Sequence, residues 1–216
     1  MVGFFLGVVG VIYGVLLAFM TVVVWEKYNT ATENVSREAT AARMMHRNLD
    51  LYPEQEEAER IKQQLRAYLH TVVTDEFPAM IKMKKSPATD QSMNNLWHDA
   101  EQLNPKNLHE QALFIDILDD LNAIAQYRDE RLGTAYNPKL IGIIRFIIIL
   151  GALITLFFAI IFAAENFWWH ITMTAMLALL LCTILYILME LAHPFMSGIS
   201  IKPDGYIDLL EKIKGK

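Results

Sequence analysis

The stretch GFFLGVVGVIYGVLLAFMTVVV, residues 3–24, is an apolar run long enough to cross a bilayer, whose hydrocarbon core needs about 20 residues. Small residues recur along it at steps of three and four, and on an α-helix such steps share one face. This small-residue stripe consists of Gly3, Gly7, Gly10, Gly14, Ala18 and Thr21. Because glycine weakens a helix in water, the stripe predicts a membrane helix that is compensated by close approach of a neighbour.

Two interpretations of the stripe stay open. As a packing face, it allows another helix to approach closely and needs no further function. As a pore wall, it leaves room for ions and exposes backbone carbonyls. Both hold together if the neighbouring helix belongs to another subunit, so the stripe predicts a homo-oligomer in which these residues pack or flank a pore.

Two later runs are also long enough to span a membrane, at Leu140–Ala164 and Trp169–Leu191. A short turn separates them, which predicts an antiparallel hairpin. The first run leads directly into a charged helix, so we interpret it as a retained anchor and not as a signal peptide. The expected fold is an all-α integral membrane protein with three transmembrane helices that continue into a cytoplasmic helical bundle.

The central segment is expected to be helical throughout, since no stretch alternates with the period of two that is typical of a strand. Expected helices follow the apolar periodicity and the Pro and Asn breaks, and they cover 26–51, 54–80, 89–103 and 108–135. The expected organisation is a first transmembrane helix over 1–25, a cytoplasmic helical region over 26–139, a transmembrane hairpin over 140–191 and a cytoplasmic tail over 192–216.

Orientation follows from the basic residues near the membrane ends. The hairpin turn carries Glu165 and no Lys or Arg, whereas all 19 Lys and Arg lie in the central segment, at Arg145 or in the tail. The N-terminus and the hairpin turn are therefore expected outside, and the central segment and C-terminus in the cytoplasm. In the tail, Lys residues alternate with Ile207, Leu209 and Ile213, which favours a short helix on the inner leaflet.

Catalytic signatures are missing from the sequence, which contains no phosphate-binding glycine loop, no paired-His zinc helix and no nucleophile elbow. We therefore expect neither an enzyme nor a cofactor. Glu190 and His193 have the Glu-x-x-His spacing of carboxylate-bridged metal sites, but such sites need two of these motifs and the chain has one. The sequence thus predicts no metal centre.

Arg145 and Glu190 lie near the same end of the expected hairpin. With its centre near Asn166, Arg145 is level with Ile187, and Glu190 is three residues further, or about 4.5 Å along the axis. Lone charges near lipid are costly, so the two side chains are expected to form an ion pair. Alternatively, they form a ring of charges at the inner mouth of a pore.

Charge in the central segment is net acidic, with 19 Asp and Glu against 14 Lys and Arg. Acidic groups that line a vestibule concentrate cations and repel anions. The basic patch at Lys82, Lys84 and Lys85 is too sparse to predict nucleic-acid binding. The expected partners are the lipid bilayer, other copies of the chain and inorganic ions.

Several blocks of the sequence resemble a known family. Residues 10–19, GVIYGVLLAF, are similar to the opening block of the bestrophin-like bacterial membrane proteins. Three later blocks fit as well: 75–78 (DEFP, where Trp is common in place of Phe77), 128–132 (RDERL) and 193–198, which begins HPF. The resemblance implies a helical protein of the bacterial inner membrane and a relation to bestrophins, which are pentameric anion-conducting channels.

These observations predict an oligomeric ion channel, for which the resemblance implies a pentamer. Its ion selectivity stays open because the acidic segment and the family relation point in opposite directions. The alternative is a non-conducting membrane-anchored scaffold or sensor whose cytoplasmic helices bind a partner protein. The residues that would serve such docking are Trp97 or the Asp75–Pro78 turn.

Overall fold

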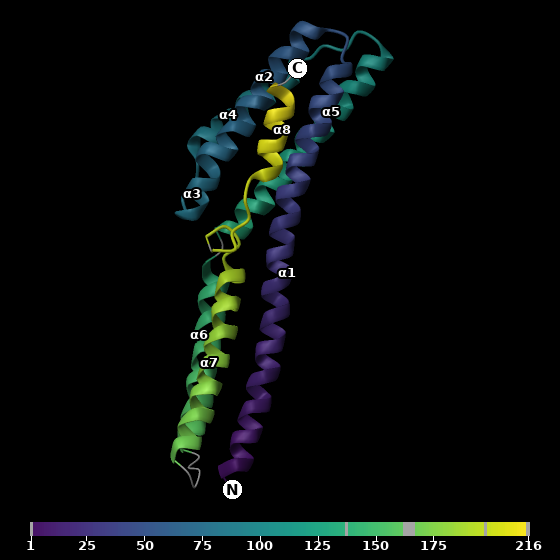
Figure 1. The fold of residues 1–216 in the computed structure, drawn as a ribbon. Helices are drawn as coiled ribbons and strands as arrows, with labels where there is room; N and C mark the ends of the chain where they lie inside the picture. The colour runs from purple at the N-terminus through teal and green to yellow at the C-terminus, as the bar shows by residue number, and fades with distance from the viewer. Residues whose placement is uncertain (1, 137, 162–166, 197, 215–216) are drawn as a thin grey trace. The chain divides into compact units, whose positions relative to one another are not determined.

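The computed structural model describes residues 2–136, 138–161, 167–196 and 198–214. Every regular element in these residues is a helix, as the absence of period-two alternation predicts (Figure 1). The chain divides into two compact units. Unit 1 comprises 1–29 and 137–199, and unit 2 comprises 30–136 and 200–216. The longest helix, α1 (Val2–Leu51), has its first part in unit 1 and the rest in unit 2.

Unit 1 consists of the start of α1 with α6 (Pro138–Ile161) and α7 (Phe167–Ala192). The helices α6 and α7 lie side by side as the expected hairpin (Figure 1). A small core joins the three helices, with Tyr13, Leu17 and Val24 from α1 packed among residues of α6 and α7. The members contributed by α6 and α7 are Ile148, Ala152, Leu181, Leu188, Leu191 and Ala192.

Most apolar side chains of unit 1 face outward. Only 17% of the most apolar window of α1 and 11% of that of α7 is buried, whereas the core helix of a water-soluble protein would be mostly buried. These two helices are long and apolar enough to cross a bilayer. The apolar stretch of α6 is shorter among the described residues, Arg145–Ile161. The expected end of this span at 162–164 lies outside the described residues, so a membrane span at α6 stays a proposal.

Unit 2 is a helical bundle built on the second part of α1. Its other helices are α2 (Gln55–Thr71), the π-helical turn η1 (Val72–Glu76), α3 (Phe77–Ile81), α4 (Pro87–Glu101), α5 (Leu108–Ala135) and α8 (Asp204–Lys214). The expected helix 54–80 is thus continuous with a π turn inside it, and π turns often mark functional sites. The bounds of α5 equal those expected, because Asn107 caps its start by accepting from the N–H of Glu110 at 3.0 Å.

The C-terminal helix α8 corrects one expectation. Its apolar face is buried inside unit 2, where Tyr206, Leu209 and Ile213 are all at most 4% exposed and α8 contacts α2. Gly205 allows the approach, since a Cβ there would lie 3.3 Å from the Cβ of Ala39. The interpretation of the tail as a helix on the inner leaflet was therefore wrong, because the same amphipathic pattern is satisfied by packing on protein.

Candidate functional site

Much of the small-residue stripe is exposed among the described residues. Gly3, Gly7 and Gly14 are exposed, and a Cβ added at Gly7, Gly10 or Gly14 would meet no atom within 4 Å. The C-terminal part of the stripe forms one wall of an open apolar groove in unit 1. The lining residues are Gly14, Leu17, Ala18 and Thr21 from α1 with Ile184, Ile187 and Leu188 from α7. The stripe therefore presents a concave apolar surface that the single chain leaves uncovered.

Thr21 is the polar member of this groove. Its hydroxyl donates to the carbonyl of Leu17 at 2.7 Å, one turn earlier on α1. Threonines in membrane helices commonly bond back in this way, because an unpaired hydroxyl is costly in hydrocarbon. The hydroxyl oxygen keeps its acceptor capacity toward the groove.

A close helix contact inside unit 1 involves a glycine outside the stripe. The Tyr13 ring lies against Gly151 of α6, where a Cβ would come within 2.3 Å of the ring atom Cε2. The Tyr13 hydroxyl donates to the carbonyl of Ile148 at 2.8 Å. Gly151, which the stripe does not include, therefore allows α1 and α6 to approach closely, whereas close packing at the stripe stays a prediction.

Arg145 and Glu190 do not form the expected ion pair in the part of the chain that the structure describes. The Arg145 guanidinium lies 3.5 Å from Nε2 of His193, whereas a Glu190 carboxylate oxygen accepts from the backbone N–H of Gly198 at 2.7 Å. The axial estimate placed the two residues at similar heights, but it contained no information about the direction in which each side chain points around its helix.

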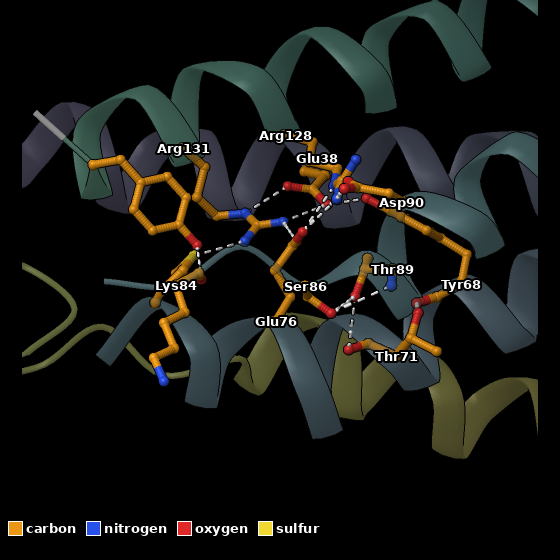
Figure 2. A network of polar contacts seen from close by, with 12 residues as sticks. Glu38, Tyr68, Thr71, Glu76, Lys84, Ser86, Thr89, Asp90, Arg128 and Arg131 are labelled. Atoms are coloured by element: carbon orange, nitrogen blue, oxygen red, sulfur yellow. Dashed lines mark hydrogen bonds and ion pairs between the residues drawn. The ribbon is translucent and has the colours of Figure 1, made fainter. Parts of the chain in front are cut away.

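A buried charge network in unit 2 was not predicted. Figure 2 shows its centre, where Arg131 of α5 contacts two carboxylates from distant parts of the chain. Nε of Arg131 donates to Glu38 at 2.8 Å, and Nη2 donates to Glu76 at 2.6 Å. All three residues are completely buried. The guanidinium also lies 5.3 Å from the centre of the Phe77 ring, within the range of a cation–π contact.

Arg128 extends the network by one helical turn of α5. Its Nε donates to Glu76 at 3.0 Å and its Nη2 donates to Asp90 of α4 at 2.6 Å. Glu76 is therefore shared between Arg128 and Arg131, and it is placed there by the π turn η1. Within the network, the buried carboxylates of Glu38 and Glu76 face the buried guanidinium groups of Arg128 and Arg131, so their charges balance. Asp90 lies at the exposed edge of the network.

Two tyrosines complete the surroundings of Glu38. The Tyr68 hydroxyl donates to the Glu38 carboxylate at 2.6 Å (Figure 2). The Tyr206 ring packs edge-to-face on Phe77, and its buried hydroxyl lies near Glu38 but has no hydrogen-bond partner of regular geometry among the described residues. Burial, reinforced by the Glu38 carboxylate, raises the pKa of both tyrosines well above the ordinary value. Both phenols are therefore neutral, and Tyr68 acts as a donor to Glu38.

The network ties α1, η1, α4 and α5 of unit 2 together by paired charges, and its arrangement fits a structural role. The described residues contain no group of three or more His, Cys, Asp or Glu side chains that could hold a metal ion. Two of the four blocks that carry the family resemblance, 75–78 and 128–132, supply Glu76, Phe77, Arg128 and Arg131. These two blocks of the family resemblance could have indicated part of the network from the sequence, whereas no sequence pattern marked Glu38 or Tyr206.

Comparison with known proteins agrees with this architecture. The model of the bestrophin-like domain matches residues 1–206. A crystal structure of a bacterial bestrophin homolog from Klebsiella pneumoniae, determined with an aspartate-to-alanine mutation, superimposes with a TM-score of 0.74 at 15% identity. The match covers 98% of this chain and 87% of that one. None of the curated proteins matches the sequence. Since the family model covers nearly the whole sequence, the chain belongs to the bestrophin-like family.

Proposed function

We propose that the chain assembles as a homo-oligomer in the bacterial inner membrane and conducts ions along the axis between its copies. The observation that carries the proposal is the groove beside the small-residue stripe, which the single chain leaves uncovered. In hydrocarbon, helices associate through close packing and not through a hydrophobic driving force, so a concave wall of small residues favours a helix of a second copy. The bestrophin fold supports the same proposal and suggests five copies.

In this proposal the three helices of unit 1 cross the membrane, and Gly10, Gly14, Ala18 and Thr21 set how closely neighbouring copies approach. Gly3 and Gly7 continue the same face toward the start of the chain. The N-terminus and hairpin turn lie outside, and unit 2 lies in the cytoplasm, in accord with the placement of Lys and Arg. Arg145 and Glu190 are near the cytoplasmic mouth as separate charges.

Selectivity for cations is part of the proposal, since the segment between the first two apolar runs is net acidic. The proposal includes no enzymatic step and no cofactor. It also drops one detail of the scaffold alternative, because Glu76 and Phe77 in the Asp75–Pro78 turn are buried in unit 2 and are not available for docking.

The test is ion flux and single-channel current from purified protein in liposomes, with Gly14→Leu beside the wild type. Leu at this position would fill the groove, so we expect a smaller assembly in detergent and loss of current. Val11→Leu is the matched control, since it adds apolar bulk at an exposed position of the same helix outside the groove. Reversal potentials in ion gradients then decide between cations and anions.

Two results would reject parts of the proposal. An unchanged oligomer and unchanged current in Gly14→Leu would remove the packing role of the stripe. If the wild-type protein is oligomeric but gives no current under any ion gradient, the channel hypothesis is rejected in favour of the non-conducting scaffold.

A further inference from the structure

A second pocket of unit 1 lies near Arg145, close to the start of α6 and the end of α7. Its walls are apolar and come from all three helices, with Val24 of α1, Ile148 of α6 and Leu185 and Leu188 of α7. Arg145 and His193 lie at its edge. Lys27 follows Val24 by one helical turn on the same face of α1, and its Nζ reaches the carbonyl of Ala192, another lining residue, at 3.5 Å.

The two cations beside this pocket lack an ion-pair partner in the described part of the chain. Among the described residues, no carboxylate lies within 4 Å of the Arg145 guanidinium or the Lys27 ammonium. The nearest polar contact of Arg145 is Nε2 of His193, whose Nδ1 lies 3.0 Å from the carbonyl of Met189. The nearby Glu190 carboxylate is held by the Gly198 N–H. Two cations therefore flank an apolar pocket while the adjacent acid is engaged elsewhere.

The pocket also lies at the depth of lipid headgroups. The apolar run of α6 begins at Leu140, five residues before Arg145, the apolar run of α1 ends two residues before Lys27, and α7 ends just before His193. The long Arg145 side chain can reach the membrane interface from that position. Trp25, an interfacial residue type, is 53% exposed at the same level of α1. Basic side chains at this depth meet the phosphates of the inner leaflet, which carries a negative surface potential.

We infer that this pocket binds one anionic phospholipid. The guanidinium of Arg145 and the ammonium of Lys27 donate to the lipid phosphate, and the start of one acyl chain lies against the exposed Met189 and the half-buried Leu185. A planar guanidinium donates two parallel hydrogen bonds to a phosphate, so Arg145 gives the larger share of the recognition. The inference rests on membrane insertion of unit 1 and not on conduction.

Lipid binding is measured by native mass spectrometry of the purified protein in detergent, titrated with phosphatidylglycerol or with phosphatidylcholine of the same chains. We expect the wild type to retain phosphatidylglycerol preferentially. Arg145→Gln should weaken that binding by about fivefold, since a basic residue at a membrane surface contributes about this factor. Lys27→Gln should weaken it to a smaller extent, and Arg145→Lys should keep only part of it, because an ammonium cannot donate the paired hydrogen bonds of a guanidinium.

Lys212→Gln is the control, since it removes the same charge from an exposed position of α8 in unit 2. An equal effect of Lys212→Gln and Arg145→Gln would overturn the inference, as would equal retention of the two lipids by the wild type. Displacement of the lipid by excess inorganic phosphate would also overturn it, by showing a site for free anions. If the assembled protein conducts no ions, weaker lipid binding by Arg145→Gln still supports the lipid site. The test of the lipid site is therefore independent of the channel.

Discussion

The two units of the chain treat polar and apolar side chains in opposite ways. Unit 1 leaves large apolar side chains outside, such as Phe19 and Phe157, which are more than 60% exposed. Unit 2 buries complete ion pairs, with Arg131, Glu38 and Glu76 fully enclosed. The difference teaches that burial follows the solvent of each unit: apolar surface is tolerated where lipid is the solvent, and charge is buried where it is fully paired.

The two units also differ in what fixes the arrangement of their helices. In unit 2, each buried charge has partners on particular helices, so the network selects one arrangement of α1, η1 and α5. In unit 1, cohesion comes from a small core and from the fit of Tyr13 against Gly151. Substitutions in the network should therefore cost more than substitutions at this fit, and three experiments test that order.

The largest effect is expected from Arg131→Met. It removes the cation between Glu38 and Glu76 and leaves two buried carboxylates facing each other, which should cost about 3–5 kcal/mol of unfolding free energy. Thermal and denaturant unfolding in detergent, followed by the helical circular dichroism signal, measures it. The control is Arg37→Gln, which breaks an exposed pair with Glu33 and should cost less than about 1 kcal/mol. Equal costs would show that the network does not stabilise unit 2.

The next effect compares two buried tyrosines of unit 2. Tyr68→Phe removes a donor to the buried Glu38 carboxylate and should cost about 1.5–3 kcal/mol. Tyr206→Phe removes a buried hydroxyl that has no hydrogen bond of regular geometry among the described residues, so it should cost less than Tyr68→Phe. The same unfolding measurement compares them, and a destabilised Tyr206→Phe with an unchanged Tyr68→Phe would reverse the assignment of the Glu38 donor.

The smallest effect concerns unit 1. Gly151→Ala places a Cβ against the Tyr13 ring, which must move and lose its bond to Ile148 at a cost of about 1–3 kcal/mol. Gly142→Ala on the same helix is the control, because a Cβ there meets no atom within 4 Å and alanine favours a helix. Unfolding midpoints in detergent report both. If Gly142→Ala were the more damaging change, the contact at Tyr13 would not be what joins α1 to α6.

Much of the fold could be predicted from local patterns. The helix 108–135 was located correctly because Asn and Pro breaks flank it and apolar periodicity marks its course, and the apolar runs correctly indicated α1 and α7 as membrane-length helices. The candidate site was harder. The positions of Arg145 and Glu190 along the hairpin were estimated from helix rise alone, and their partners depend on rotation about each helix, which the sequence does not contain.

The sequence by itself determined the helical class, the membrane-length runs and the small-residue stripe, because hydrophobic length and three-to-four spacing are local properties of a helix. Only the tertiary structure decided that Glu38, Glu76, Arg128 and Arg131 form one buried network, since these residues are 38 to 93 positions apart, except for Arg128 and Arg131 on α5. It also decided that α8 packs on unit 2. An amphipathic face demands burial, but the partner that provides it is chosen by the three-dimensional packing of the rest of the chain.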